Sequence, residues 1–238
     1  MKRLFVSAAV VAALSGNASA AILYSNDFDG NLVVGTGVSV AGLTNGALDP
    51  GNTFGDWTGS YFRNNSAGNP ALMSTLTLSN LAPHTQVSAS FILGFLESWD
   101  SRDGGCCSPD NLDFYIDDVK VASLTARNAL GTIEDFGGGS VTAHFVQANG
   151  NFFYSDTLVD MSSAPFLNFA HTGATLKLGI QASGAGWQGG DDEAWGIDKV
   201  AITYDGRPVP EPSTWGMMVV GALLAGATLR RRVAANKG

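Results

Sequence analysis

The clearest pattern in the chain is a run of apolar residues at every second position over residues 87–96. Side chains of one parity lie on one face of an extended strand. Five apolar residues share that parity here: Val87, Ala89, Phe91, Leu93 and Phe95. The same alternation predicts further strands over residues 72–78, 112–116, 141–145 and 176–182. Because no long window of helical period interrupts residues 21–205, we expect a single all-β domain, an antiparallel β-sandwich.

The parity of the apolar positions changes within the last predicted strand. Trp195 and Ile197 share one parity, and the apolar positions from Val200 onward share the other. A slip of one residue would turn side chains to the wrong face of the sheet. We therefore expect a β-bulge within residues 196–199, which would also redirect the side chain of Asp198.

The first twenty residues have the three parts of a secretory signal peptide. They begin with two basic side chains, continue with an apolar run over residues 4–14, and end in the small-residue triplet 18–20. This order predicts export and cleavage before Ala21. An N-terminal core helix is the alternative interpretation, and it leaves the basic start and the small-residue triplet unexplained.

The other end of the chain carries an uncharged stretch over residues 213–229, which predicts a transmembrane helix. Three basic residues follow it directly: Arg230, Arg231 and Arg232. They predict that the tail stays in the cytoplasm and that the body lies outside. A helix over residues 215–229 would rise only about 22 Å, against about 30 Å of hydrocarbon. A buried C-terminal helix is therefore the alternative.

A Pro-Glu-Pro triplet, Pro210, Glu211 and Pro212, stands just before this stretch. The order of triplet, short apolar helix and Arg cluster over residues 206–238, joined to a signal peptide, resembles the PEP-CTERM sorting signal of Gram-negative, exopolysaccharide-producing bacteria. The resemblance implies recognition by an exosortase, a membrane transpeptidase resembling cysteine proteases, which cuts near the triplet. It also implies a final place at the cell surface or in the extracellular matrix, and it says nothing about the role of the body.

Two segments of the body resemble strands of concanavalin-like and carbohydrate-binding-module jelly rolls. They are the sequence WGIDKVAI over residues 195–202 and the predicted hairpin over residues 112–121. Lys199 stands where that family usually has Asn or Asp. The resemblance implies a jelly-roll-like sandwich.

The charge of the body argues against nucleic acid as a partner. Residues 21–209 hold seven Lys and Arg against 20 Asp and Glu, a net charge of −13. A surface this negative repels phosphate backbones.

Clustered acids make calcium the first candidate cofactor, because calcium takes six to eight oxygen ligands. One predicted set of ligands joins the start of the body to its end, if the first strand pairs with the last: Asp27, Asp29, Asp191, Asp192, Glu193 and Asp198. A second acidic cluster lies in a Gly-rich loop: Asp100, Asp103, Asp110 and Asp113. Solvated acids on turns are the alternative for both clusters.

Glycan binding is the second candidate function, because exposed aromatic rings stack on sugars. Four aromatic residues sit among Gly, Asn, Asp and Ser rather than in alternating strands: Trp57, Tyr61, Trp99 and Trp187. Burial in the core is the alternative for each ring, and aromatic side chains are more often buried than exposed.

The only two cysteines, Cys106 and Cys107, are adjacent in a chain with an export signal. We expect a vicinal disulfide, with intermolecular bridges or free thiols as alternatives. Glycoside hydrolysis is disfavoured, because no two Glu stand close enough to form the usual catalytic array, although an Asp-only pair stays open.

We therefore predict a non-catalytic surface or biofilm-matrix protein that associates with exopolysaccharide and is stabilised by calcium. A structural matrix protein without a glycan site is one alternative, and a surface hydrolase is the other.

Overall fold

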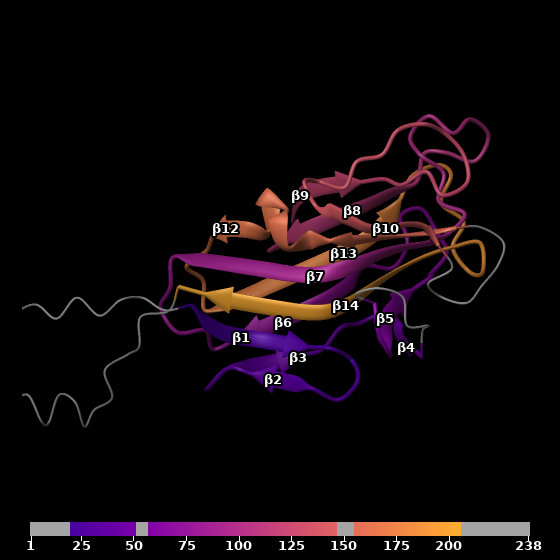
Figure 1. Cartoon of the computed structure of the whole chain (residues 1–238). Helices are drawn as coiled ribbons and strands as arrows, with labels where there is room; N and C mark the ends of the chain where they lie inside the picture. Colours follow the sequence, from indigo (N-terminus) through magenta and orange to yellow (C-terminus); the bar gives the residue numbers. More distant parts are fainter. Residues whose placement is uncertain (1–19, 51–56, 147–154, 206–238) are drawn as a thin grey trace, which may run out of the picture. The chain divides into compact units, whose positions relative to one another are not determined.

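The computed structural model describes residues 20–50, 57–146 and 155–205. They form two antiparallel sheets packed face to face, which confirms the predicted all-β sandwich (Figure 1). The jelly-roll topology stays a prediction. Within the described residues, no helix is both long and apolar enough to cross a membrane. The span predicted over residues 213–229 and all but the last residue of the predicted signal peptide lie outside the described residues.

The larger sheet is built around its two longest strands, β7 (Gln86–Glu97) and β14 (Glu193–Tyr204), which pair along most of their length. In the described residues this sheet has nine strands, with a main order of β10-β11-β7-β14-β1-β2. The other strands of this order are β1 (Ala21–Asn26), β2 (Leu32–Val34), β10 (Ser140–Val146) and β11 (Asp156–Asp160). Three short strands join at the sides: β12 (Asn168–Ala170) on β7, β5 (Tyr61–Asn64) on β14, and β4 (Ala47–Asp49) on β5.

The smaller sheet has five strands among the described residues, in the order β3-β6-β13-β8-β9. They are β3 (Ser39–Ala41), β6 (Ser74–Ser79), β13 (Thr175–Ser183), β8 (Asn111–Ile116) and β9 (Val119–Leu124). Two 3-10 turns, η1 (Met161–Ser163) and η2 (Pro165–Leu167), lead from β11 to β12. The strands predicted from alternation over 87–96, 72–78, 112–116, 141–145 and 176–182 correspond to β7, β6, β8, β10 and β13.

The core lies between the sheets and contains the apolar face predicted for β7. All five of its predicted side chains, at positions 87, 89, 91, 93 and 95, are buried there. Phe91 stacks on Phe114 of the smaller sheet, with ring centroids 6.0 Å apart. Full burial of a large apolar side chain contributes about 1.5–3 kcal/mol. The alternation along β7 therefore selects the face that holds the two sheets together.

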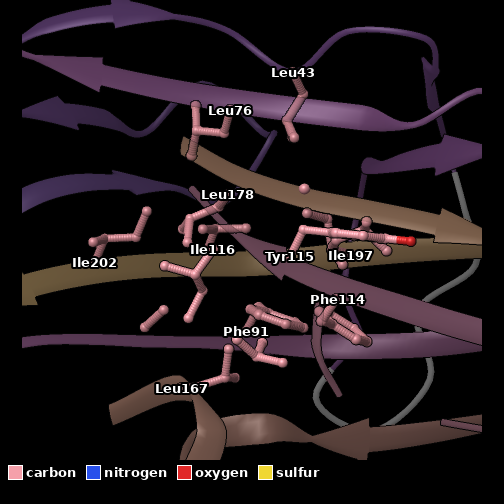
Figure 2. A pocket seen from close by; sticks show the side chains of 15 residues that line it. Leu43, Leu76, Phe91, Phe114, Tyr115, Ile116, Leu167, Leu178, Ile197 and Ile202 are labelled. Carbon is pink, nitrogen blue, oxygen red and sulfur yellow. The ribbon is translucent and has the colours of Figure 1, made fainter. Parts of the chain in front are cut away.

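A small cavity remains between the sheets, with a volume of about 40 Å³ (Figure 2). Its walls are mostly apolar and include Phe91 of the larger sheet and Phe114 and Leu178 of the smaller one. An engineered apolar cavity that binds benzene measures about 150 Å³. This cavity is too small for such a ligand, and it is a packing void.

The predicted bulge is present in β14. The register between β14 and β7 shifts between Asp198 and Ala201, and Lys199 has a φ of 50°. The shift lets both parities of β14 meet the core, because Ile197 and Ile202 are both buried. The first strand also pairs with the last, with Ala21 opposite Tyr204.

The face of β7 that points away from the smaller sheet carries a second apolar cluster, built on two glycines. Gly94 of β7 pairs with Gly196 of β14. A Cβ atom at Gly94 would lie 2.9 Å from the Trp57 ring, and one at Gly196 would lie 2.7 Å from the Tyr61 ring. The centroids of the two rings lie 4.5 Å apart, and the rings fill the space that the glycines leave open. Trp57 and Tyr61 are therefore buried in this second apolar cluster.

Candidate functional site

Three carboxyl groups from separate segments meet at one end of the sandwich. Asp100 follows β7, Asp110 directly precedes β8, and Glu193 is the first residue of β14. Asp110 and Glu193 are fully buried, and Asp100 is 4% exposed. One carboxylate oxygen from each residue can be chosen so that all three lie within 4.8 Å of one another. In the described residues this is the one group of three such side chains with this geometry.

Backbone hydrogen bonds hold these acids in place. The Asp100 N–H donates to Asp110 Oδ2 at 2.6 Å, and the Asp110 N–H donates to the Asp100 carbonyl oxygen at 3.0 Å. Glu193 Oε2 accepts from the N–H groups of Gln188 at 2.5 Å and Gly189 at 3.3 Å. Each of the two fully buried acids is thus fixed through one of its oxygens.

The remaining oxygens have no hydrogen-bond donor. Asp100 Oδ1, Asp110 Oδ1 and Glu193 Oε1 are buried without a hydrogen-bond partner. Most buried polar atoms in proteins are hydrogen-bonded, so three orphan oxygens in one cluster need an explanation.

Burial makes ionisation of this cluster costly. Desolvation, and then the charge of Glu193, raise the pKa of Asp110 to about 8. Desolvation raises the pKa of Glu193 to about 7, although the Gln188 and Gly189 N–H groups oppose it. Desolvation also raises the pKa of Asp100. All three shifts have the same main cause, which is the removal of charged carboxylates from water.

The six acids predicted as one set of metal ligands do not converge, which corrects that prediction. Asp27 accepts hydrogen bonds from Asn31 within its own loop, and its pKa is lowered by them. Asp29 Oδ1 accepts from the Ser60 N–H at 2.7 Å. Glu193 alone of the six joins the buried cluster, together with two residues of the other predicted set.

The three remaining members of that set, Asp191, Asp192 and Asp198, lie on or just before β14. Asp191 is exposed, and Asp192 accepts a hydrogen bond from the Ser98 hydroxyl at 2.8 Å. Asp198 is buried at the bulge, where Oδ1 accepts from the Lys199 N–H at 2.6 Å. Desolvation raises the pKa of Asp198 to about 6.

The second predicted acidic cluster is also divided by the fold. Asp100 and Asp110 enter the buried group, whereas Asp103 binds the Thr132 side chain and backbone, and its pKa is lowered by its hydrogen bonds. Asp113 pairs with Lys120 at 3.2 Å. Sequence spacing could not separate these roles, because the partners are 7–29 positions away along the chain.

All four aromatic residues predicted to be exposed for glycan stacking are buried, so the packing alternative holds for each. Trp57, Tyr61 and Trp99 are 0% exposed, and Trp187 is 5% exposed. The Trp99 Nε1–H group donates to the Ala194 carbonyl at 2.6 Å, and its ring lies 5.2 Å from that of Trp187. Trp99 directly precedes Asp100, and Trp187 directly precedes Gln188, whose N–H group donates to Glu193.

Cys106 and Cys107 are free thiols in the structure, with their sulfur atoms 2.9 Å apart. Their mutual hydrogen bond raises the pKa of Cys107 to about 11. The vicinal disulfide stays a prediction.

Comparison with known proteins bears on the C-terminal segment. No curated protein matches the sequence significantly. Residues 208–232 match the model of the PEP-CTERM protein-sorting motif, and they include the predicted triplet at 210–212 and the Arg cluster. These residues lie outside the described part of the structure. The chain thus carries a PEP-CTERM sorting motif, which implies an exported surface protein that is anchored in the membrane and then processed by an exosortase, itself a membrane enzyme.

Proposed function

We propose that the processed sandwich is a non-catalytic structural component of the cell surface or extracellular matrix of a Gram-negative bacterium. The observation that carries this proposal is the sorting motif at residues 208–232, joined to a sandwich with its own core. The net charge of −13 over residues 21–209 gives the body long-range repulsion from other acidic polymers unless cations intervene.

The placement of the acids supports a non-catalytic role. Two carboxyl groups at close range could in principle act as acid and base on a glycosidic bond. A surface depression of about 240 Å³ is lined by Asp100 and Asp192, but neither Asp110 nor Glu193 lines it. A substrate in that depression would therefore not reach the pair of acids with the most strongly raised pKa values.

Glycan association is a second candidate, favoured by a groove rather than by the four aromatic residues predicted from the sequence. The groove measures about 570 Å³, within the range of ligand sites, and is lined by Asn26, Phe28 and Leu48 among others. Phe28 is partly exposed and offers a ring, while Asn26 offers an amide. A ring beside an amide can stack on a sugar and bind its hydroxyl groups.

The sorting step is tested in a bacterium that has an exosortase. The full chain would be produced with an epitope inserted after Ala21, beside a variant in which residues 210–212 are all Ala. We expect the wild-type body in the extracellular and surface fractions at reduced mass. The variant should stay in the inner membrane at full length. Equal processing of both chains, or retention of both at full length, would contradict the proposal.

The glycan candidate is tested by co-sedimentation of the full chain, in detergent, with exopolysaccharide of the same host. Phe28→Ala should weaken binding about 10-fold, equivalent to about 1.4 kcal/mol. Phe145→Ala is the matched control, because Phe145 is an exposed aromatic residue that does not line the groove. Absence of wild-type binding would leave the structural role without a glycan site.

A further inference from the structure

We propose that Asp100, Asp110 and Glu193 hold one calcium ion that ties the loop after β7 to the start of β14. The site differs from the six-residue set predicted from the sequence. It follows from the fold and does not depend on where the protein is sorted.

The first argument is the orientation of the carboxylates. Backbone N–H groups hold Asp110 Oδ2 and Glu193 Oε2. The second oxygen of each group, Oδ1 or Oε1, is left buried without a donor. In each of these two residues the protein thus positions one carboxylate oxygen and leaves the other available to a cation.

The second argument is charge. Three carboxyl groups share a site of 0–4% exposure. None of the ion pairs among the described residues involves any of the three. The neighbouring charged group is Asp192, which adds negative charge and raises the pKa of both Asp100 and Glu193. Buried charges are normally paired or bound to a metal, and a divalent cation supplies the missing positive charge.

The third argument is the type and spacing of the ligands. Calcium binds oxygen at about 2.3–2.6 Å, so two oxygens on opposite sides of one ion are at most about 5 Å apart. The three ligand atoms all lie within 4.8 Å of one another. Zinc and copper favour imidazole and thiolate ligands, and magnesium keeps most of its own water. A buried cluster made of carboxylates alone fits calcium better than it fits these ions.

The competing explanation is that protons, rather than an ion, neutralise the cluster. Asp110 and Glu193 could share a proton, because their side chains lie within hydrogen-bonding reach of each other once one of them is protonated, and their pKa values are both raised. The two explanations predict different responses of stability to calcium. A cation site is stabilised by added calcium, whereas a proton-sharing pair is indifferent to it.

The test is the melting temperature of the full chain in detergent at pH 7.5, with about 10 mM calcium and then with excess chelator. Extracellular calcium modules have dissociation constants of about 0.1–1 mM. Calcium at this concentration should therefore raise Tm by about 3–10 °C for a chain of this size. Terbium, which replaces calcium, should show luminescence sensitised by Trp99, the residue next to Asp100.

Two isosteric variants identify the ligands. Asp110→Asn and Glu193→Gln keep an oxygen that can accept the backbone hydrogen bonds, but they remove the ligand charge. Both should reduce the calcium shift in Tm to less than about 1 °C, together with the terbium signal. Asp191→Asn is the matched control, because Asp191 is exposed and close in sequence to Glu193. It should keep the full response.

Three outcomes would overturn the site. They are no calcium shift in the wild type, an equal shift in all three variants, or an equal shift with magnesium. If one variant fails to fold, the other two chains and terbium binding to the wild type still decide the question. The proposed function rests on the sorting motif and does not depend on calcium binding. A negative result in this experiment would therefore overturn the calcium site and leave the proposed function unchanged.

Discussion

Gly94 and Gly196 are direct partners across the β7–β14 ladder, and together they leave the space in which the Trp57 and Tyr61 rings pack. The rings meet at an angle of 55°. Gly in a strand costs conformational entropy, and it is found where another group approaches the backbone closely. Here two such positions are paired, so that two aromatic rings cover the centre of the larger sheet.

The first prediction concerns these glycines. Gly94→Ala and Gly196→Ala should each lower the free energy of unfolding by about 1–3 kcal/mol, because the added methyl group meets a buried ring. Denaturant unfolding of the full chain in detergent measures this. Gly42→Ala is the control, since a Cβ there meets nothing within 4 Å, and its effect should stay within about 0.5 kcal/mol. A neutral Gly94→Ala would mean that Trp57 does not pack on β7.

The second prediction concerns pH. The pKa values of Asp110 and Glu193 in the folded protein, about 8 and about 7, exceed the values of about 3.9 and 4.3 in an unfolded chain. Between about pH 4 and pH 8 the folded state therefore holds more protons than the unfolded state. Stability in chelator should fall as pH rises through this range, by up to about 1.4 kcal/mol per pH unit for each group.

Melting curves at several pH values, with chelator and with calcium, measure this dependence. Calcium should flatten the curve, because the ion replaces the protons. Asp110→Asn should also flatten it, because the amide does not titrate. An unchanged slope in that variant would assign the pH dependence to other acids, such as Asp198, whose pKa is raised to about 6.

The third prediction concerns Trp99 and Trp187. Trp99→Phe removes the donor to the Ala194 carbonyl, and Trp187→Phe removes the donor to the Ser66 carbonyl at 3.0 Å. Each should lower the free energy of unfolding by about 1–3 kcal/mol. Co-sedimentation with exopolysaccharide should stay unchanged, because both rings are buried. Loss of polysaccharide binding at wild-type stability would restore these rings as ligand contacts.

The fourth prediction concerns the cysteine pair. Export places Cys106 and Cys107 in an oxidising compartment. We expect the non-reduced protein to be two hydrogens lighter than the reduced one, as a monomer. Mass spectrometry under denaturing conditions measures this. A full-mass monomer would show free thiols, and a dimer lost on reduction would show an intermolecular bridge.

The strands can be predicted from the sequence alone, because the alternation of side chains along a strand is a local signal. The pattern over residues 87–96 identifies β7 and its core face, and the parity change after Ile197 locates the bulge in β14. β1 pairs with β14, which is the condition that the predicted metal set requires.

The site could not be predicted, because it depends on contacts between distant segments. The structure places Glu193 beside Asp100 and Asp110, and no local pattern indicates this, because these two acids stand 83–93 positions earlier in the chain. Trp57 and Tyr61 have Gly, Asn, Asp and Ser as sequence neighbours, and their burial depends on glycines in two other strands. Gly94 within a strongly alternating strand was the one available signal, because such a glycine often marks a close approach.

The position of β14 has a mechanical consequence. The C-terminal sorting segment leaves the sandwich through this strand, which lies between β7 and β1 within the larger sheet. A pull on the end of β14 that is directed along the strand tests its pairing with both neighbours. Such a pull loads the antiparallel ladders on both sides of β14 in shear, so that many hydrogen bonds must break at the same time. An edge strand that is pulled sideways loses its hydrogen bonds one pair at a time. A surface protein held by its C-terminal end would thus be tethered through a strand that resists extraction under tension.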